Sequence, residues 1–224
     1  MSAKSPVHGT DVREASRSVY PGWLKTGFWV CVVIAVAVVL RRVAVLVHPA
    51  QSSSPTAALD AVFASHAALT LAHILPAMAF VLLTPFVLLR RSSSAWAERL
   101  FFLLGSWVGI TAYLMSAHPV GGWIERSAVL LFNSLFLFCL LRAFMAARQG
   151  EALEKMRWML RSVAILLGIA TTRPVMGVFF ATSRLTHLEP GQFFGVAFWI
   201  GFSINTIAIE LWLLSRRGRL PVAG

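Results

Sequence analysis

The sequence predicts an all-α fold, an integral membrane bundle of six transmembrane helices, from three observations. Of the 224 residues, 58% are hydrophobic and only 13% are charged, whereas a soluble domain carries about 25% charged residues. The mean hydropathy is +0.74. The apolar runs are too long for the strands of a membrane barrel, and helices satisfy their own backbone hydrogen bonds in lipid. These observations exclude an ordinary soluble enzyme.

Six apolar segments follow one another along the chain. Each is about as long as a helix needs to be to cross the hydrocarbon core of a bilayer. The predicted helices are residues 24–47, 62–89, 100–117, 127–146, 158–183 and 192–214.

The first three predicted helices contain residues that shape them. Arg41 and Arg42 lie near the end of the first helix, where their side chains can extend outward to the membrane surface. Gly105 and Gly109 give the third helix the spacing that allows close packing against a neighbour. Prolines are expected to kink the second and fifth helices, and these prolines are Pro76, Pro85 and Pro174.

The last three predicted helices are also interrupted at only a few positions. The fourth contains Asn133 and Arg142 as its strongly polar residues. The fifth begins with a basic and aromatic stretch at 157–162. The sixth contains Gly195 and Gly201, which favour close helix packing.

Positively charged residues predict the orientation of the bundle. Most Lys and Arg residues outside the apolar segments fall in the two tails and in the second and fourth connections, which share one side of a six-helix topology. Both termini are therefore expected in the cytoplasm. The predicted organisation is a polar cytoplasmic tail over 1–22, a transmembrane domain over 23–214 and a basic cytoplasmic tail over 215–224, in the cytoplasmic (inner) membrane of a bacterium.

The net charge of +11 would suggest nucleic-acid binding in a soluble protein. Here it is explained by membrane orientation, because the charges lie mostly between the apolar segments. The expected partner is the lipid bilayer, together with a small ligand or another membrane protein, and not nucleic acid.

Polar side chains at membrane depth are the best candidates for function, because each is costly to bury without a local partner. At about 1.5 Å per residue, several of them fall at similar depth in the outer half of the bundle. His66 shares a helix face with His73. We predict a polar, ligand-binding layer formed by His66, His73, Tyr113, Asn133 and Arg173.

A second group of charged residues lies near the cytoplasmic end. Arg161 on the fifth helix and Glu210 on the sixth fall at similar depth. We interpret them as a structural ion pair between neighbouring helices.

The histidines leave several chemistries open. A metal site, a pair of haem ligands, a proton relay and a quinone headgroup site would all use them. A b-type haem would need histidines from two facing helices, so His118 or His187 would have to join His73 or His66. No catalytic motif is found, and the identity of any metal or cofactor, haem included, stays open.

The chain also resembles a bacterial family of multi-pass membrane proteins catalogued as domain of unknown function 2306. The resemblance covers about residues 66–181. It rests on His73, LTPF at 83–86, LRR at 89–91, RL at 99–100 continuing to Gly105, RWMLRS at 157–162 and TR at 172–173. It implies a bacterial inner-membrane helical bundle without an established biochemical role.

Two departures from this family pattern concern histidines. The family shows a histidine in a stretch like HRWxGR before the third helix, where this chain has AWAER at 95–99, and another just before the RWM segment, where Lys155 stands. If those histidines bind haem or metal, this chain lacks them, and His73 and Arg173 are the matching polar positions that remain.

The expected function is therefore that of a non-enzymatic membrane protein whose polar layer binds a small ligand or supports a membrane complex. The alternative is an electron-transfer protein that uses a b-type haem or a quinone. A proton-coupled transporter would need a deep carboxylate or an inverted repeat, and neither is evident.

Overall fold

A computed structural model describes residues 21–47, 57–89, 95–186 and 190–217. These residues form seven helices, which confirms the all-helical prediction. The helices are α2 (Gly22–Val47), α3 (Ala57–Ser65), α4 (Ala67–Leu89), α5 (Ala95–Met115), α6 (Gly122–Gln149), α7 (Ala152–Thr186) and α8 (Pro190–Arg217).

Five of the described helices are long and apolar enough to cross a membrane. The five spans are Gly22–Val47, Ala67–Leu88, Gly122–Gln149, Ala152–Thr182 and Gly191–Arg216. Two described helices lie outside this group. Helix α3 has only 9 residues, and the first turns of α5 carry Glu98 and Arg99, which shorten its apolar stretch.

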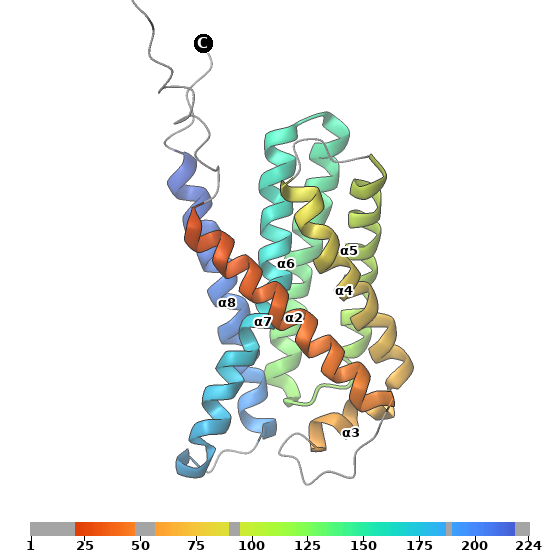
Figure 1. Cartoon of the computed structure of the whole chain (residues 1–224), viewed down its shortest axis with the longest axis vertical. Coiled ribbons are helices and arrows are strands. Elements are labelled where there is room, and N and C mark those ends of the chain that lie inside the picture. Colours follow the sequence, from red (N-terminus) through yellow and green to blue (C-terminus); the bar gives the residue numbers. More distant parts are fainter. Residues whose placement is uncertain (1–20, 48–56, 90–94, 187–189, 218–224) are drawn as a thin grey trace, which may run out of the picture.

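The long helices form an upright bundle with one helix laid across it (Figure 1). Helices α4 and α5 pack as one pair, α7 and α8 as another, and α6 packs against α5, α7 and α8. Helix α2 crosses the bundle diagonally and packs on both α4 and α7. The N-terminal end of α2 and the C-terminal end of α8 lie at the same end of the bundle, opposite α3.

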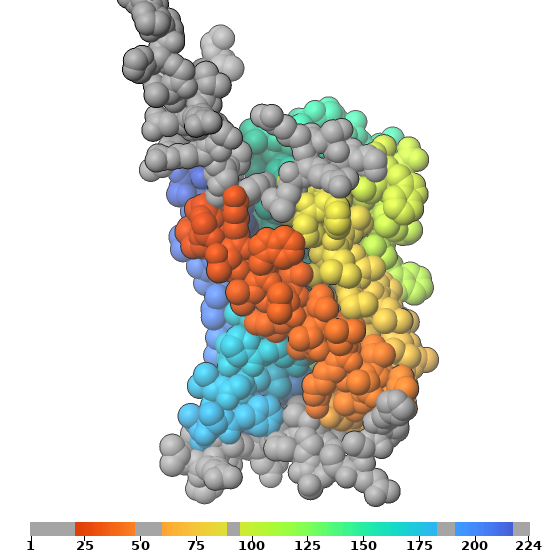
Figure 2. All heavy atoms as spheres, in the orientation of Figure 1, coloured from red at the N-terminus to blue at the C-terminus, as the bar shows by residue number. Residues whose placement is uncertain are grey.

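Helix α2 is peripheral. Val32 is its one buried side chain, and Figure 2 shows the helix lying along the surface. The core is formed instead by the other helices, where the largest fully buried side chains include Phe80, Phe101 and Phe193.

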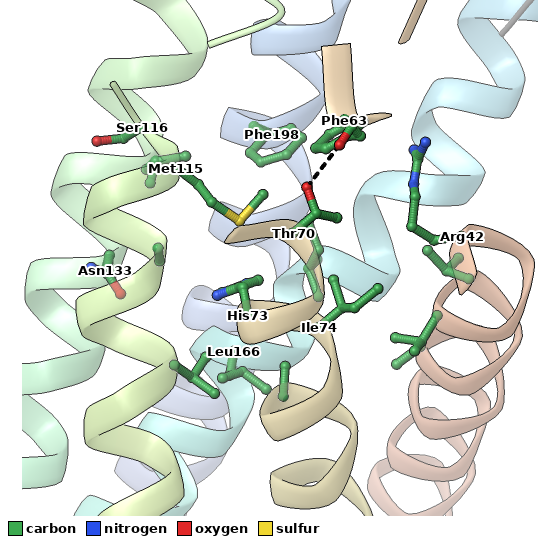
Figure 3. A pocket seen from close by; sticks show the side chains of 18 of the residues that line it. Arg42, Phe63, Thr70, His73, Ile74, Met115, Ser116, Asn133, Leu166 and Phe198 are labelled. Carbon is green, nitrogen blue, oxygen red and sulfur yellow. Dashed lines mark hydrogen bonds between the residues drawn. The ribbon is translucent and has the colours of Figure 1, made fainter. Parts of the chain in front are cut away.

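The predicted second helix is divided in two, which corrects the expectation of one continuous helix over 62–89. Helix α3 ends at Ser65 and α4 begins at Ala67. The Thr70 hydroxyl donates to the Phe63 carbonyl at 3.1 Å (Figure 3). The Ser65 hydroxyl donates to the Val62 carbonyl at 2.8 Å. The two acceptor carbonyls belong to the last turn of α3, where backbone carbonyls lack partners within the helix, and these side chains provide such partners.

Helix α4 continues past Pro76, although a proline has no N–H for the carbonyl four residues earlier. That carbonyl belongs to Ala72, and the indole Nε1 of Trp107 on α5 donates to it at 2.8 Å. A side chain on the neighbouring helix therefore replaces the missing backbone hydrogen bond.

The glycines for which the sequence predicts close packing lie where two helices contact each other. A Cβ at Gly105 would meet Leu140 and Phe80, and one at Gly109 would collide with Leu137. On α8, a Cβ at Gly201 would come within 2.7 Å of the backbone nitrogen of Thr172. Small residues thus let α5 approach α6 and let α8 approach α7.

Candidate functional site

A cavity of about 250 Å³ lies inside the bundle, between α2, α4, α5, α6, α7 and α8. Most of its lining is aliphatic or aromatic, including Ile74, Met115, Leu166 and Phe198 (Figure 3). A few polar side chains from different helices also face it. A mostly apolar hollow with a small number of polar groups is typical of a small-molecule site.

The structure brings together four of the five residues predicted to form a ligand-binding layer. His66, His73, Asn133 and Arg173 all line the cavity. Tyr113 does not line it, because its side chain lies between α5 and α6, where its hydroxyl hydrogen-bonds with the Ser134 hydroxyl at 2.7 Å. The Tyr113 side chain is therefore directed toward α6 and not into the cavity.

His73 is held in one orientation by α5. Its Nδ1 lies 2.9 Å from the Thr111 hydroxyl oxygen. Where that hydroxyl donates its own proton to the Trp107 carbonyl, 2.8 Å away, Nδ1 is the donor to Thr111. The neutral imidazole then has a lone pair on Nε2, which makes His73 a hydrogen-bond acceptor at the cavity wall.

Asn133 is fixed in a similar way. Its Nδ2 donates to the Gly109 carbonyl at 2.9 Å, across the close contact between α5 and α6. The asparagine therefore both joins these helices and adds a polar group to the cavity wall (Figure 3).

Arg173 on α7 stands apart from the other polar residues because no carboxylate approaches it among the described residues. Its Nε is buried without a hydrogen-bond partner. The described contact of Nη1 is the Met176 sulfur at 3.9 Å, a weak acceptor. The guanidinium lines the cavity and retains donors for a ligand.

Two histidines at the α3 end of the cavity contact each other. His66, in the break between α3 and α4, stacks on His118 with ring centroids 4.1 Å apart and an interplanar angle of 33°. Both line the cavity. Rings in direct contact leave no room for a porphyrin between them, so this pair does not have the geometry of two axial haem ligands.

Arg41 and Arg42 do not simply extend outward, contrary to the sequence expectation, because Asp60 on α3 binds both. The distances are 3.0 Å from Arg41 Nη2 and 2.5 Å from Arg42 Nη1. The Arg42 guanidinium also lies 4.2 Å from the Phe63 ring centroid. Arg42 thereby joins α2 to α3 and lines the cavity.

Sequence reasoning missed three cavity-lining residues: Arg42, His118 and Glu125. Glu125 is buried in the first turn of α6, and its Oε2 accepts a hydrogen bond from the Gly121 N–H at 2.6 Å. An acidic residue so close to an apolar segment was an available signal. For His118 the sequence suggests a meeting with His66 or His73 only as part of a haem site, and not the direct ring contact that the structure shows.

Arg161 and Glu210 form an ion pair between α7 and α8, away from the main cavity. Arg161 Nε lies 2.5 Å from Glu210 Oε1, and Nη2 lies 3.0 Å from Oε2. The Trp158 ring lies 4.6 Å from the Arg161 guanidinium carbon. The pair faces a second hollow of about 260 Å³, which Cys139 also lines.

No group of three or more His, Cys, Asp or Glu side chains that could hold a metal ion occurs among the described residues. His48, His187, residues 1–20 of the predicted N-terminal tail and residues 218–224 of the C-terminal tail lie outside the described residues.

A comparison with protein-family models matches residues 70–213 to the predicted membrane proteins of domain of unknown function 2306 (DUF2306). The chain belongs to this family. The match begins at residue 70, slightly after the expected 66, and extends past the expected 181 to include almost all of α8. Neither curated proteins nor solved structures gave a match.

The two places in this DUF2306 chain where the resemblance predicts a histidine, before the third predicted helix and at Lys155, lie close together in space. Lys155, at the start of α7, forms an ion pair with Glu98 in the first turn of α5, with Nζ and Oε1 2.7 Å apart. An interhelical ion pair therefore occupies the end of the bundle opposite the stacked histidines.

Proposed function

We propose that this DUF2306 protein is a six-span protein of the bacterial inner membrane whose cavity binds a small, mostly apolar ligand without chemical conversion. The observation that carries the proposal is the cavity itself. Apolar walls give a ligand affinity, and the polar groups of His73, Asn133 and Arg173 would orient it.

The proposed topology treats α5 as the sixth span, with both termini in the cytoplasm. The 21 residues of α5 correspond to about 31 Å of helix, close to the thickness of a bilayer core. Support also comes from the antiparallel packing of α5 between α4 and α6. The excess of Lys and Arg in alternate connections favours the cytoplasmic orientation.

The ligand proposal is tested by filling the cavity. Ala77→Phe on α4 places an aromatic ring in the cavity, whereas Ala79→Phe adds the same ring two residues away at an exposed position. Mass spectrometry of organic extracts from the purified proteins should detect a bound compound with wild type and Ala79→Phe, and much less of it with Ala77→Phe. Equal recovery from both variants, or none from wild type, contradicts the proposal.

The haem alternative is addressed by the visible absorption spectrum of the protein in mild detergent. A ligand-binding protein of the proposed kind gives no Soret band. A Soret band that disappears in His73→Ala would replace this proposal with electron transfer.

A further inference from the structure

The titratable side chains that line the cavity differ in how well the protein satisfies them. They are Arg42, His66, His73, His118, Glu125 and Arg173. Arg42 forms an ion pair with Asp60 at 2.5 Å. Glu125 accepts the Gly121 N–H at 2.6 Å, and the histidines contact Thr111, Ser65 or each other. Of the three charged side chains in this group, Arg42, Glu125 and Arg173, only Arg173 has no oxygen or nitrogen partner among the described residues, and its Nε is buried.

The charged groups around Arg173 make the binding of an anion beside it more favourable. The charged groups that act on it are Arg42 and Arg41, both of the same sign. Asp60 offsets one charge of these two arginines. A cation buried at membrane depth is costly, and such residues pair with an opposite charge or mark a ligand pathway.

Glu125 does not supply the missing negative charge. It lines the same cavity, but its carboxylate accepts a hydrogen bond within its own helix start, from the N–H of Gly121. No ion pair joins it to Arg173 in the part of the chain that the structure describes.

We propose that the cavity binds an amphiphile with one anionic group, a carboxylate or a phosphate, which pairs with Arg173. This inference rests on the proposed function, since it names the class of the ligand for the same cavity. The guanidinium offers planar N–H donors that match either anion. The apolar part of the ligand lies against aromatic side chains of α8, such as Phe198 and Phe202.

The size of the cavity narrows the ligand further. Its volume of about 250 Å³ is below the usual range of small-molecule sites, which begins at about 300 Å³. A single short apolar chain with its headgroup fits this space better than a whole two-chain lipid. Free fatty acids and phosphate esters of single chains share the required chemistry.

The test compares three probes with the same ten-carbon chain: decanoate, decyl phosphate and uncharged 1-decanol. Dissociation constants are measured by native mass spectrometry of the full-length protein released from detergent. Wild type should bind at least one anionic probe about tenfold or more tightly than decanol, as expected for a charge-assisted hydrogen bond. A preference for decanoate identifies a fatty-acid type of ligand, and a preference for decyl phosphate identifies a phosphate ester.

Variants assign this preference to one side chain. In Arg173→Gln the ratio of anion to decanol affinity should fall toward one, while Arg173→Lys, which keeps the charge, retains a preference for anions. Arg126→Gln is the matched control, because Arg126 is exposed and lies against the Trp123 ring, outside the cavity lining; it should keep the wild-type ratio.

The possible failures are distinguishable. Equal affinity of wild type for all three probes, or an anion preference that survives in Arg173→Gln, overturns the inference about Arg173 and leaves the cavity proposal standing. Failure of wild type to bind any of the three probes overturns both.

Discussion

Arg161 and Arg173 lie on the same helix but in opposite circumstances. Two guanidinium nitrogens of Arg161, Nε and Nη2, donate to the Glu210 carboxylate, so the charge of Arg161 is compensated within the protein. The Nε of Arg173 is buried without a partner. A charge without a partner lowers the stability of the ligand-free protein, and such a cost is typical of binding sites.

This contrast predicts opposite effects of the same substitution. Arg173→Met should raise the thermal unfolding temperature of ligand-free protein, because it removes an uncompensated buried cation. Arg161→Met should lower stability by about 1–3 kcal/mol, less than for a fully buried pair, because it leaves Glu210 unpaired and the Glu210 side chain is 40% exposed. Tryptophan fluorescence during heating in detergent measures both; a lower unfolding temperature for Arg173→Met would show that Arg173 is satisfied.

The depth of a residue is predictable from sequence, but its direction around the helix axis is less so. Counting residues along each helix predicts a similar depth for His73, Asn133 and Arg173, and in the structure all three line one cavity. Tyr113 has the same predicted depth and faces Ser134 instead. Its direction depends on how α5 is rotated against α6, which side-chain packing decides.

At the scale of the helices, hydropathy locates apolar segments and does not resolve their interruptions. The break at His66 contains neither proline nor glycine, and it is accompanied by hydrogen bonds from Ser65 and Thr70 to nearby carbonyls. Pro76, which does signal a break, lies inside a continuing helix because α5 supplies Trp107. The break at His66 thus involves short-range side-chain hydrogen bonds, whereas the continuity of the helix at Pro76 involves a tertiary contact.

Glycine packing gives a prediction at this scale. Gly201→Ala places a methyl group within 2.7 Å of the Thr172 backbone and should destabilise the protein by about 1–3 kcal/mol, because two packed backbones must separate. Gly177→Ala is the control, since a Cβ there meets nothing within 4 Å and helix propensity favours alanine by up to about 1 kcal/mol. Denaturation in detergent should rank Gly201→Ala below wild type and Gly177→Ala at or above it. Equal stabilities would show that α7 and α8 separate without cost.

At the scale of the whole molecule, the N-terminal end of α2 and the C-terminal end of α8 lie at the same end of the bundle (Figure 1). This arrangement requires an even number of crossings if both helices span the membrane. Five apolar helices would place the ends on opposite sides, so α5 must be the additional span in the proposed topology. The distribution of positive charges in the sequence favours the same parity.

Reporter fusions check the topology. Green fluorescent protein fused after residue 224 should fluoresce, and alkaline phosphatase at the same position should be inactive, because both report a cytoplasmic C-terminus. Alkaline phosphatase inserted in the connection between α5 and α6, after His118, should be active. Active alkaline phosphatase at the C-terminus would contradict the proposed orientation. If the reporters placed residue 224 and the insertion after His118 on the same side of the membrane, α6, α7 and α8 could not all span it.

The hydrogen bond between Trp107 and the Ala72 carbonyl has a consequence for how the family can vary. Alanine in place of Pro76 would let the backbone bond to Ala72 form again, and the indole of Trp107 would no longer be needed there. Conversely, losing the indole while keeping the proline leaves a carbonyl unsatisfied in lipid. We therefore expect that related sequences which lose the proline at position 76 also lose the tryptophan at position 107.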